Sequence, residues 1–98
     1  MGKKTGHCFP FREQRDTAVL TCSHVLDGKA PILYVTHDEE DGMRQFLCGA
    51  GHTVSEARLV SLEEIFSLDS TVGALSEMPP GYFAVRKRPD DDWMLRQK

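Results

Sequence analysis

The chain has 98 residues, of which 40% are hydrophobic, and a formal net charge of −3 at pH 7. This length fits one domain with a small core, and no apolar run approaches the roughly 20 residues that a membrane-spanning helix needs. The charges are mixed along the chain and give no basic face, which excludes a general nucleic-acid-binding protein. The first residues lack the apolar segment of a secretory signal, and three cysteines favour reduced thiols in a cytoplasmic protein over a disulfide framework.

The N-terminal part, residues 1–16, is predicted to be a partly disordered tail before a single domain at residues 17–98. Within the tail, two alternatives stay open for Phe9 and Phe11. The rings either dock on the edge of the core or form an exposed interaction patch together with Trp93. The first strand is predicted at 17–22, followed by a turn that ends in Asp27-Gly28.

The next segment reads as two strands joined by an acidic turn. Ile32–His37 and Met43–Cys48 carry the β-branched and aromatic residues that suit a pleated, half-buried surface. The turn between them is Asp38-Glu39-Glu40-Asp41-Gly42, and its Asp-Gly pair is a strong turn signal. We expect this hairpin to form the middle of the sheet, with its like charges exposed to water.

Residues 57–60 fit either a short strand or the approach to a helix, and helical signals follow. Ser61 and Glu64 form a capping box, and Leu62, Ile65 and Phe66 then make one apolar helical face. Asp69 caps a second short helix, predicted at 71–77, whose inward residues are Val72, Ala74 and Leu75.

The last elements are two strands. Residues 82–88 alternate as a strand near a sheet edge, with Arg86-Lys87-Arg88 interpreted as its solvated end. Trp93–Leu95 is a last apolar anchor and is interpreted as one more short strand. Strands first, then helices, then strands predict an α+β fold. We expect a small twisted, mostly antiparallel sheet with one layer of one or two short helices.

Two cysteines and two histidines form the set with the clearest chemical meaning. Cys22 and Cys48 each end a predicted strand, and His24 and His52 follow them closely. Two thiolates and two imidazoles bind zinc tetrahedrally, so these residues are a candidate zinc site. Their spacings are not those of zinc fingers or ribbons, and the alternative is that both cysteines are small buried core residues with two loop histidines.

A thiol enzyme is a further alternative. Cys48 precedes Gly-Ala-Gly, and His52 is four residues further along, which places an imidazole within reach of the thiol. The sequence shows neither an oxyanion donor nor a catalytic pocket. We therefore expect a protein without enzymatic activity and assign no catalytic residue.

The acidic turn is the candidate partner-binding element. Its residues are Asp38, Glu39, Glu40 and Asp41. They lack the alternating ligands and distal glutamate of an EF-hand loop, so a calcium site is not predicted. An acidic tip on a rigid hairpin suits a basic protein partner. No prediction of oligomeric state follows.

Several short motifs resemble a family of small bacterial proteins of unknown function that is related to immunity proteins of polymorphic-toxin systems. They are Val25-Leu26-Asp27-Gly28-Lys29 with Ile32 and Tyr34; Asp41-Gly42 with Phe46 and Gly49; Leu62, Ile65 and Asp69; and Leu75 with Pro79-Pro80-Gly81, Ala84 and Arg86. Family members often carry a tryptophan after the Asp-Gly turn, where this chain has Met43-Arg44. The resemblance implies an α+β fold and a binding protein that neutralises a toxin, with no catalytic residues.

Overall fold

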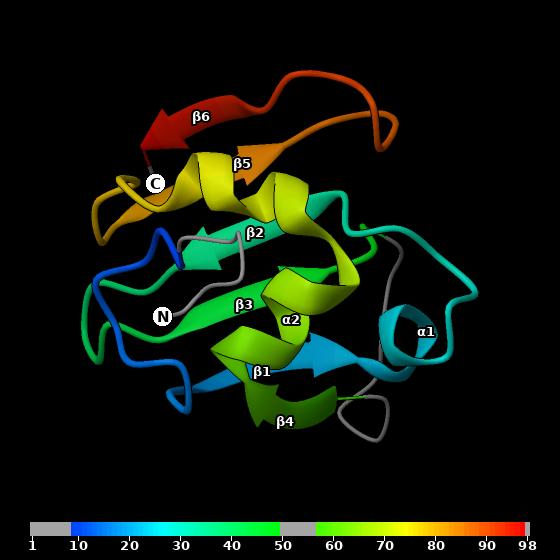
Figure 1. Cartoon of the computed structure of the whole chain (residues 1–98). Helices are drawn as coiled ribbons and strands as arrows, with labels where there is room; N and C mark the ends of the chain where they lie inside the picture. Colours follow the sequence, from blue (N-terminus) through cyan, green and yellow to red (C-terminus); the bar gives the residue numbers. More distant parts are fainter. Residues whose placement is uncertain (1–8, 50–56, 98) are drawn as a thin grey trace, which may run out of the picture.

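The fold is a six-stranded sheet with short helices on one face (Figure 1). The computed structural model describes residues 9–49 and 57–97. The strand order is β4-β1-β3-β2-β5-β6, and every neighbouring pair is antiparallel except β1 and β3, which are parallel. The strands are β1 (Ala18–Cys22), β2 (Tyr34–His37), β3 (Arg44–Leu47), β4 (Ala57–Ser61), β5 (Tyr82–Val85) and β6 (Met94–Gln97).

The helices of the described residues are α1 (Ser23–Leu26), α2 (Leu62–Leu68) and the 3₁₀ helix η2 (Ser70–Leu75). Figure 1 shows α2 and η2 in front of one face of the sheet and α1 beyond the end of β1. The predicted caps are present: Glu64 N donates to Ser61 Oγ at 3.1 Å, and Thr71 N donates to Asp69 Oδ1 at 3.0 Å. The predicted α+β fold with one helical layer is confirmed.

The predictions for two local elements need correction. The turn predicted after the first strand contains α1, whose four residues are too few to give a helical hydrophobic pattern. The second short helix is a 3₁₀ helix that ends at Leu75. A 3₁₀ helix repeats every three residues, so Val72 and Leu75 share the buried side while Ala74 is exposed rather than inward.

The core lies between the helices and one face of the sheet. Val35 pairs with Phe46 on β3 and with Ala84 on β5, and all three side chains are completely buried. Buried residues of the helices complete this core; they are Val25, Leu62, Ile65, Val72 and Leu75.

Part of the predicted N-terminal tail packs on this core. Phe11 is 6% exposed, and its ring meets that of Phe66 edge-on at a centroid distance of 6.2 Å. Phe9 is half-buried and lies 5.5 Å from Phe11, and Trp93 packs against the same core. Docking on the core edge is therefore the alternative that holds, and the predicted exposed patch of Phe9, Phe11 and Trp93 is wrong.

The acidic hairpin occupies the centre of the sheet as predicted. Its strands β2 and β3 are the two middle strands, and the turn closes with Gly42 at φ +72° and with Met43 N donating to Asp41 Oδ1. Glu39, Glu40 and Asp41 are exposed, while Asp38 is half-buried. The prediction of an exposed tip is confirmed for those three residues.

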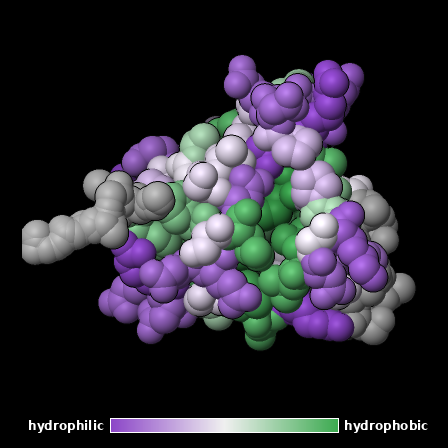
Figure 2. All heavy atoms as spheres, turned by 45° about the vertical axis from the view of Figure 1, so that its right-hand side comes forward, coloured by the Kyte–Doolittle hydropathy of each residue, from purple (hydrophilic) through white to green (hydrophobic). Residues whose placement is uncertain are grey.

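The short helix α1 contributes one buried side chain to the core. Of its four residues only Val25 is buried. Beside it is a shallow hollow of about 370 Å³ whose lining includes Val25, Ile32 and Leu68, and Leu68 is 51% exposed. Figure 2, which turns this side of the molecule forward, shows hydrophobic residues gathered in a band between hydrophilic ones.

Among residues 9–49 and 57–97, no helix has the length and apolar character needed to cross a lipid bilayer.

Candidate metal centre

The parallel pairing of β1 and β3 brings two cysteines to the same edge of the sheet. Leu20 pairs with Gln45 and Thr21 with Phe46, so the carboxyl ends of both strands point the same way. Thr21 Oγ1 donates a hydrogen bond of 2.6 Å to the carbonyl oxygen of Phe46, which fixes the two strands immediately before the site. Cys22 is the last residue of β1, and Cys48 follows the last residue of β3.

The helix α1 adds a histidine to this edge. It starts directly after Cys22, so His24 lies two residues beyond the end of β1. The carbonyl oxygen of His24 accepts hydrogen bonds from the amides of Lys29 at 2.9 Å and Ala30 at 3.2 Å. These bonds close the end of α1, where Gly28 has a φ of +72° that suits glycine. The backbone of His24 is therefore fixed on both sides.

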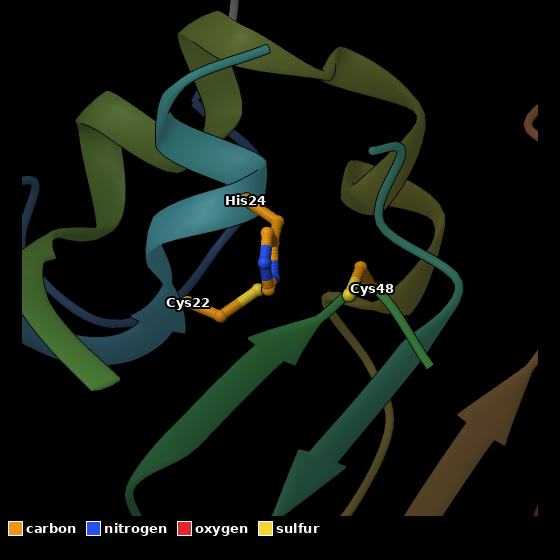
Figure 3. Close-up of side chains that lie close together, drawn as sticks. All are labelled: Cys22, His24 and Cys48. Carbon is orange, nitrogen blue, oxygen red and sulfur yellow. The ribbon is translucent and has the colours of Figure 1, made fainter. Parts of the chain in front are cut away.

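The three side chains converge. The two Sγ atoms and a ring nitrogen of His24 all lie within 4.8 Å of one another. In Figure 3 the side chains of Cys22 and Cys48 approach from the two strands, and the ring of His24 extends from α1 into the space between them. Cys22 is 1% exposed and Cys48 is 7% exposed, while His24 is half-buried. The site is thus shielded from water on the side of the cysteines.

This arrangement has the donor set of a transition-metal site. Two thiolates and one neutral imidazole are soft and borderline ligands, which suit zinc and copper(I) rather than magnesium or calcium. Neither cysteine is in a disulfide. Of the four residues predicted from the sequence, the structure brings together Cys22, His24 and Cys48; His52 lies outside the described residues.

The acidic turn lies at the other end of the same strand. β3 begins next to the turn and ends next to Cys48, so its four residues separate the two candidate sites by about 13 Å along the strand. Together with Pro80, Gly81 and Gln97, the turn lines a hollow of about 440 Å³. Asp38 Oδ2 accepts a hydrogen bond from Gln45 Nε2 at 3.2 Å, which holds one side of the turn.

Two buried arginines were not predicted from the sequence. Arg86 is 6% exposed, so it is not part of a solvated strand end, although Lys87 and Arg88 are exposed. Its guanidinium donates twice to the carbonyl oxygen of Ile32, and Asp69 accepts from it at 2.8 Å. Arg86 also lies 4.0 Å from the centre of the Trp93 ring. The sequence signal for the burial of Arg86 was the two-residue alternation of residues 82–88, which places Arg86 on the same face of the strand as the buried Ala84.

Arg44 forms the second buried ion pair. It is 3% exposed and donates to Glu13 at 2.7 Å and to the carbonyl oxygens of Leu75 and Ser76. Burial by itself raises the pKa of the Glu13 carboxyl, but the hydrogen bond from Arg44, a backbone hydrogen bond and the positive charge of Arg44 together outweigh it, so the pKa lies below its usual value. Both arginines link helices or loops to the sheet, and we assign them a structural role.

Comparisons with known proteins give no relative. No protein family model, no curated protein and no solved structure matches the chain. The resemblance to immunity-related proteins therefore stays a prediction.

Proposed function

We propose that this protein binds one zinc ion through Cys22 Sγ, Cys48 Sγ and a ring nitrogen of His24. The observation that carries the proposal is the mutual distance of at most 4.8 Å between these three atoms. In a tetrahedral zinc site, sulfur at about 2.3 Å and nitrogen at about 2.0 Å from the metal give ligand atoms separated by about 3.5–3.8 Å. Side-chain rotations that shorten the longest separation by about 1 Å are enough to reach this geometry.

Charge balance also supports zinc. An unpaired thiolate in a shielded site is unfavourable because burial penalises the charged form. Two thiolates together carry the charge that a divalent cation neutralises, and neutral imidazole adds no charge. A bound zinc ion would thus allow Cys22 and Cys48 to be buried as thiolates, the form in which they bind the metal.

The proposed role of the metal is structural. The ligands come from β1, α1 and the residue after β3, and α1 has only Val25 buried. One ion bound to all three would fix α1 against the sheet edge. Three protein ligands leave one of the four tetrahedral coordination positions of zinc open. The sequence predicts His52 for this position, and a water molecule is the alternative.

Elemental analysis of untagged protein, purified under reducing conditions without added metal, tests the proposal. We expect one zinc per chain and its loss in each of three variants, Cys22→Ser, His24→Ala and Cys48→Ser. Cys8→Ser is the matched control, because it removes a thiol that is not in the proposed ligand set. Retention of one tightly bound zinc by both Cys22→Ser and Cys48→Ser would refute this site.

Cobalt(II) gives an independent measurement of the ligands. Thiolate coordination produces a sulfur-to-cobalt absorption band in the near ultraviolet, and tetrahedral geometry produces intense visible bands. We expect both to saturate at one equivalent of cobalt and to be displaced by zinc. The His52→Ala variant then decides the fourth position: weaker binding with a changed visible spectrum supports His52, and an unchanged spectrum supports water.

A second proposed function is the binding of a protein partner at the acidic turn, as expected for an immunity-type protein. It is supported by the exposure of Glu39, Glu40 and Asp41 and by the open hollow that the turn lines with Pro80 and Gly81. A basic partner segment complements this charge. Both proposed functions are non-catalytic, and they use opposite ends of β3, so one chain is able to have both.

Affinity capture from a bacterial lysate, with the wild type and a Glu39→Lys/Glu40→Lys variant in parallel, tests this second function. We expect a basic protein that is recovered with the wild type and lost with the variant. The association should weaken as salt increases, because exposed charges are screened. Equal recovery with both baits would show that the turn is not the contact.

A further inference from the structure

We propose that Cys22 and Cys48 also form a reversible intramolecular disulfide, so that metal binding at this site is controlled by oxidation. The inference deepens the proposed zinc function and rests on it for its biological meaning. The disulfide itself depends only on the positions of the two thiols, which makes the two ideas separable by experiment.

The strand register places the two cysteines at a suitable separation. Since Thr21 pairs with Phe46 in the parallel pair, Cys22 is level with Leu47, and Cys48 is one residue further along. A neighbouring strand at about 4.8 Å and an offset of about 3.3 Å give a Cα separation of about 5.8 Å. Disulfides in proteins have Cα separations of about 5.5–6 Å most often. In regular strands a one-residue offset puts two side chains on opposite faces, so the convergence of the Sγ atoms at the strand ends, rather than the register, brings the two thiols together.

The side chains already point toward one another. Their Sγ atoms lie within 4.8 Å (Figure 3), and a disulfide bond requires about 2.05 Å. Rotation of the side chains about their Cα–Cβ bonds brings the sulfurs together. The same rotation removes both sulfurs as thiolate ligands, and His24, with or without the predicted ligand His52, then lacks the thiolates that supply most of the affinity for zinc. Disulfide and metal are therefore mutually exclusive.

The reaction requires a two-electron oxidant, and we name a low-molecular-weight disulfide such as oxidised glutathione. The sulfur of Cys48, which at 7% is the more exposed of the two, attacks one sulfur of this oxidant. The S–S bond of the oxidant breaks, and one small thiol leaves. Cys22 then attacks the mixed disulfide on Cys48 and displaces the second small thiol. Two protein thiols are oxidised, the small disulfide is reduced, and any bound zinc is released as the ion.

The experiment uses the full chain with Cys8→Ser, which leaves Cys22 and Cys48 as the only thiols. Zinc-loaded and chelator-treated samples are titrated with oxidised glutathione. Intact mass reports the loss of two hydrogen atoms, peptide mapping identifies the linked cysteines, and a metallochromic indicator reports released zinc. We expect a Cys22–Cys48 linkage in both samples, slower formation in the loaded one, and one zinc released for each disulfide formed.

Additional measurements test whether the disulfide and the zinc ion exclude one another. Reduction with dithiothreitol should restore zinc binding completely, and the oxidised protein should bind none. In the Cys8→Ser background, Cys22→Ser should stop at a stable mixed disulfide on Cys48. If the chelator-treated protein yields only mixed disulfides or intermolecular links, or if the disulfide form still binds one zinc, the inference is overturned. A protein that forms the linkage but never binds zinc refutes the proposed function and leaves the thiol chemistry standing.

Discussion

Removal of zinc should lower the thermal stability of this protein by a large and calculable amount. A ligand that binds only the folded state adds RT ln(1 + [L]/Kd) to the free energy of unfolding, which is about 2.7 kcal/mol at a free zinc concentration of 100 times Kd. For a domain of this size, 1 kcal/mol changes the melting temperature by about 4–8 °C. We therefore expect a difference of about 10–20 °C between zinc-buffered and chelator-treated protein.

The structural reason is that Cys48 lies far from Cys22 and His24 in the sequence but close to them in space. Cys22 and Cys48 are separated by α1 and the whole of β2 and β3, so the unfolded chain rarely holds them in a geometry that binds metal. Zinc should thus bind the folded state with strong preference. Thermal unfolding followed by far-ultraviolet circular dichroism, at fixed free zinc and then in excess chelator, measures the difference.

Variants make this measurement specific. Cys48→Ser should melt at the same temperature with and without zinc, while Cys8→Ser should show the full difference of the wild type. The melting temperature of each variant with zinc is compared with that of the same variant without zinc. The loss of stability caused by a serine at the buried Cys48 position is present in both measurements and therefore cancels. A wild-type melting temperature that is independent of zinc, in protein shown to bind one equivalent, would refute the structural role of the metal.

Three further predictions concern the residues that hold the fold around the two candidate sites. Because Arg44 holds the pKa of Glu13 below its usual 4.5, ionised Glu13 stabilises the fold above that pH and the contribution disappears on acidification. Glu13→Gln should therefore cost about 1–2 kcal/mol at pH 7 and less at lower pH. Arg86→Lys should cost about 2–4 kcal/mol in urea unfolding, because a lysine does not reproduce the guanidinium bonds to main-chain and side-chain oxygens. Gly49→Ala should cost about 1–2 kcal/mol and weaken cobalt binding, because Gly49 has a φ of +88° directly after Cys48.

Two of these predictions have a control in the same chain. Lys87→Ala, at an exposed neighbour of Arg86, should change stability by less than about 0.5 kcal/mol. Gly42→Ala removes a glycine with φ +72° at the distant acidic turn, so it should cost stability without affecting cobalt binding. A stability difference for Glu13→Gln that stays constant from pH 7 to pH 3 would contradict the assignment of the Arg44–Glu13 pair.

Local patterns predicted much of the secondary structure correctly. The acidic Asp-Gly turn between two β-rich runs indicated the central hairpin, and the Ser61 capping box indicated the start of α2. These predictions succeed because turn and cap preferences act within about four residues. The short helix α1 was missed because its position depends on packing of Val25 and on backbone bonds to His24.

The sequence by itself indicated the strands other than β4, the exposed acidic turn and the four candidate zinc ligands. For β4 the sequence allowed either a short strand or the approach to a helix. Only the tertiary structure decided that β1 pairs in parallel with β3, which brings Cys22, His24 and Cys48 together. It also decided that Arg86 is buried rather than solvated, because Ile32 and Asp69, distant in sequence, supply its acceptors. The physical reason is the same in both cases: strand and charge patterns are local properties, whereas the choice of neighbour depends on contacts between segments far apart in the chain.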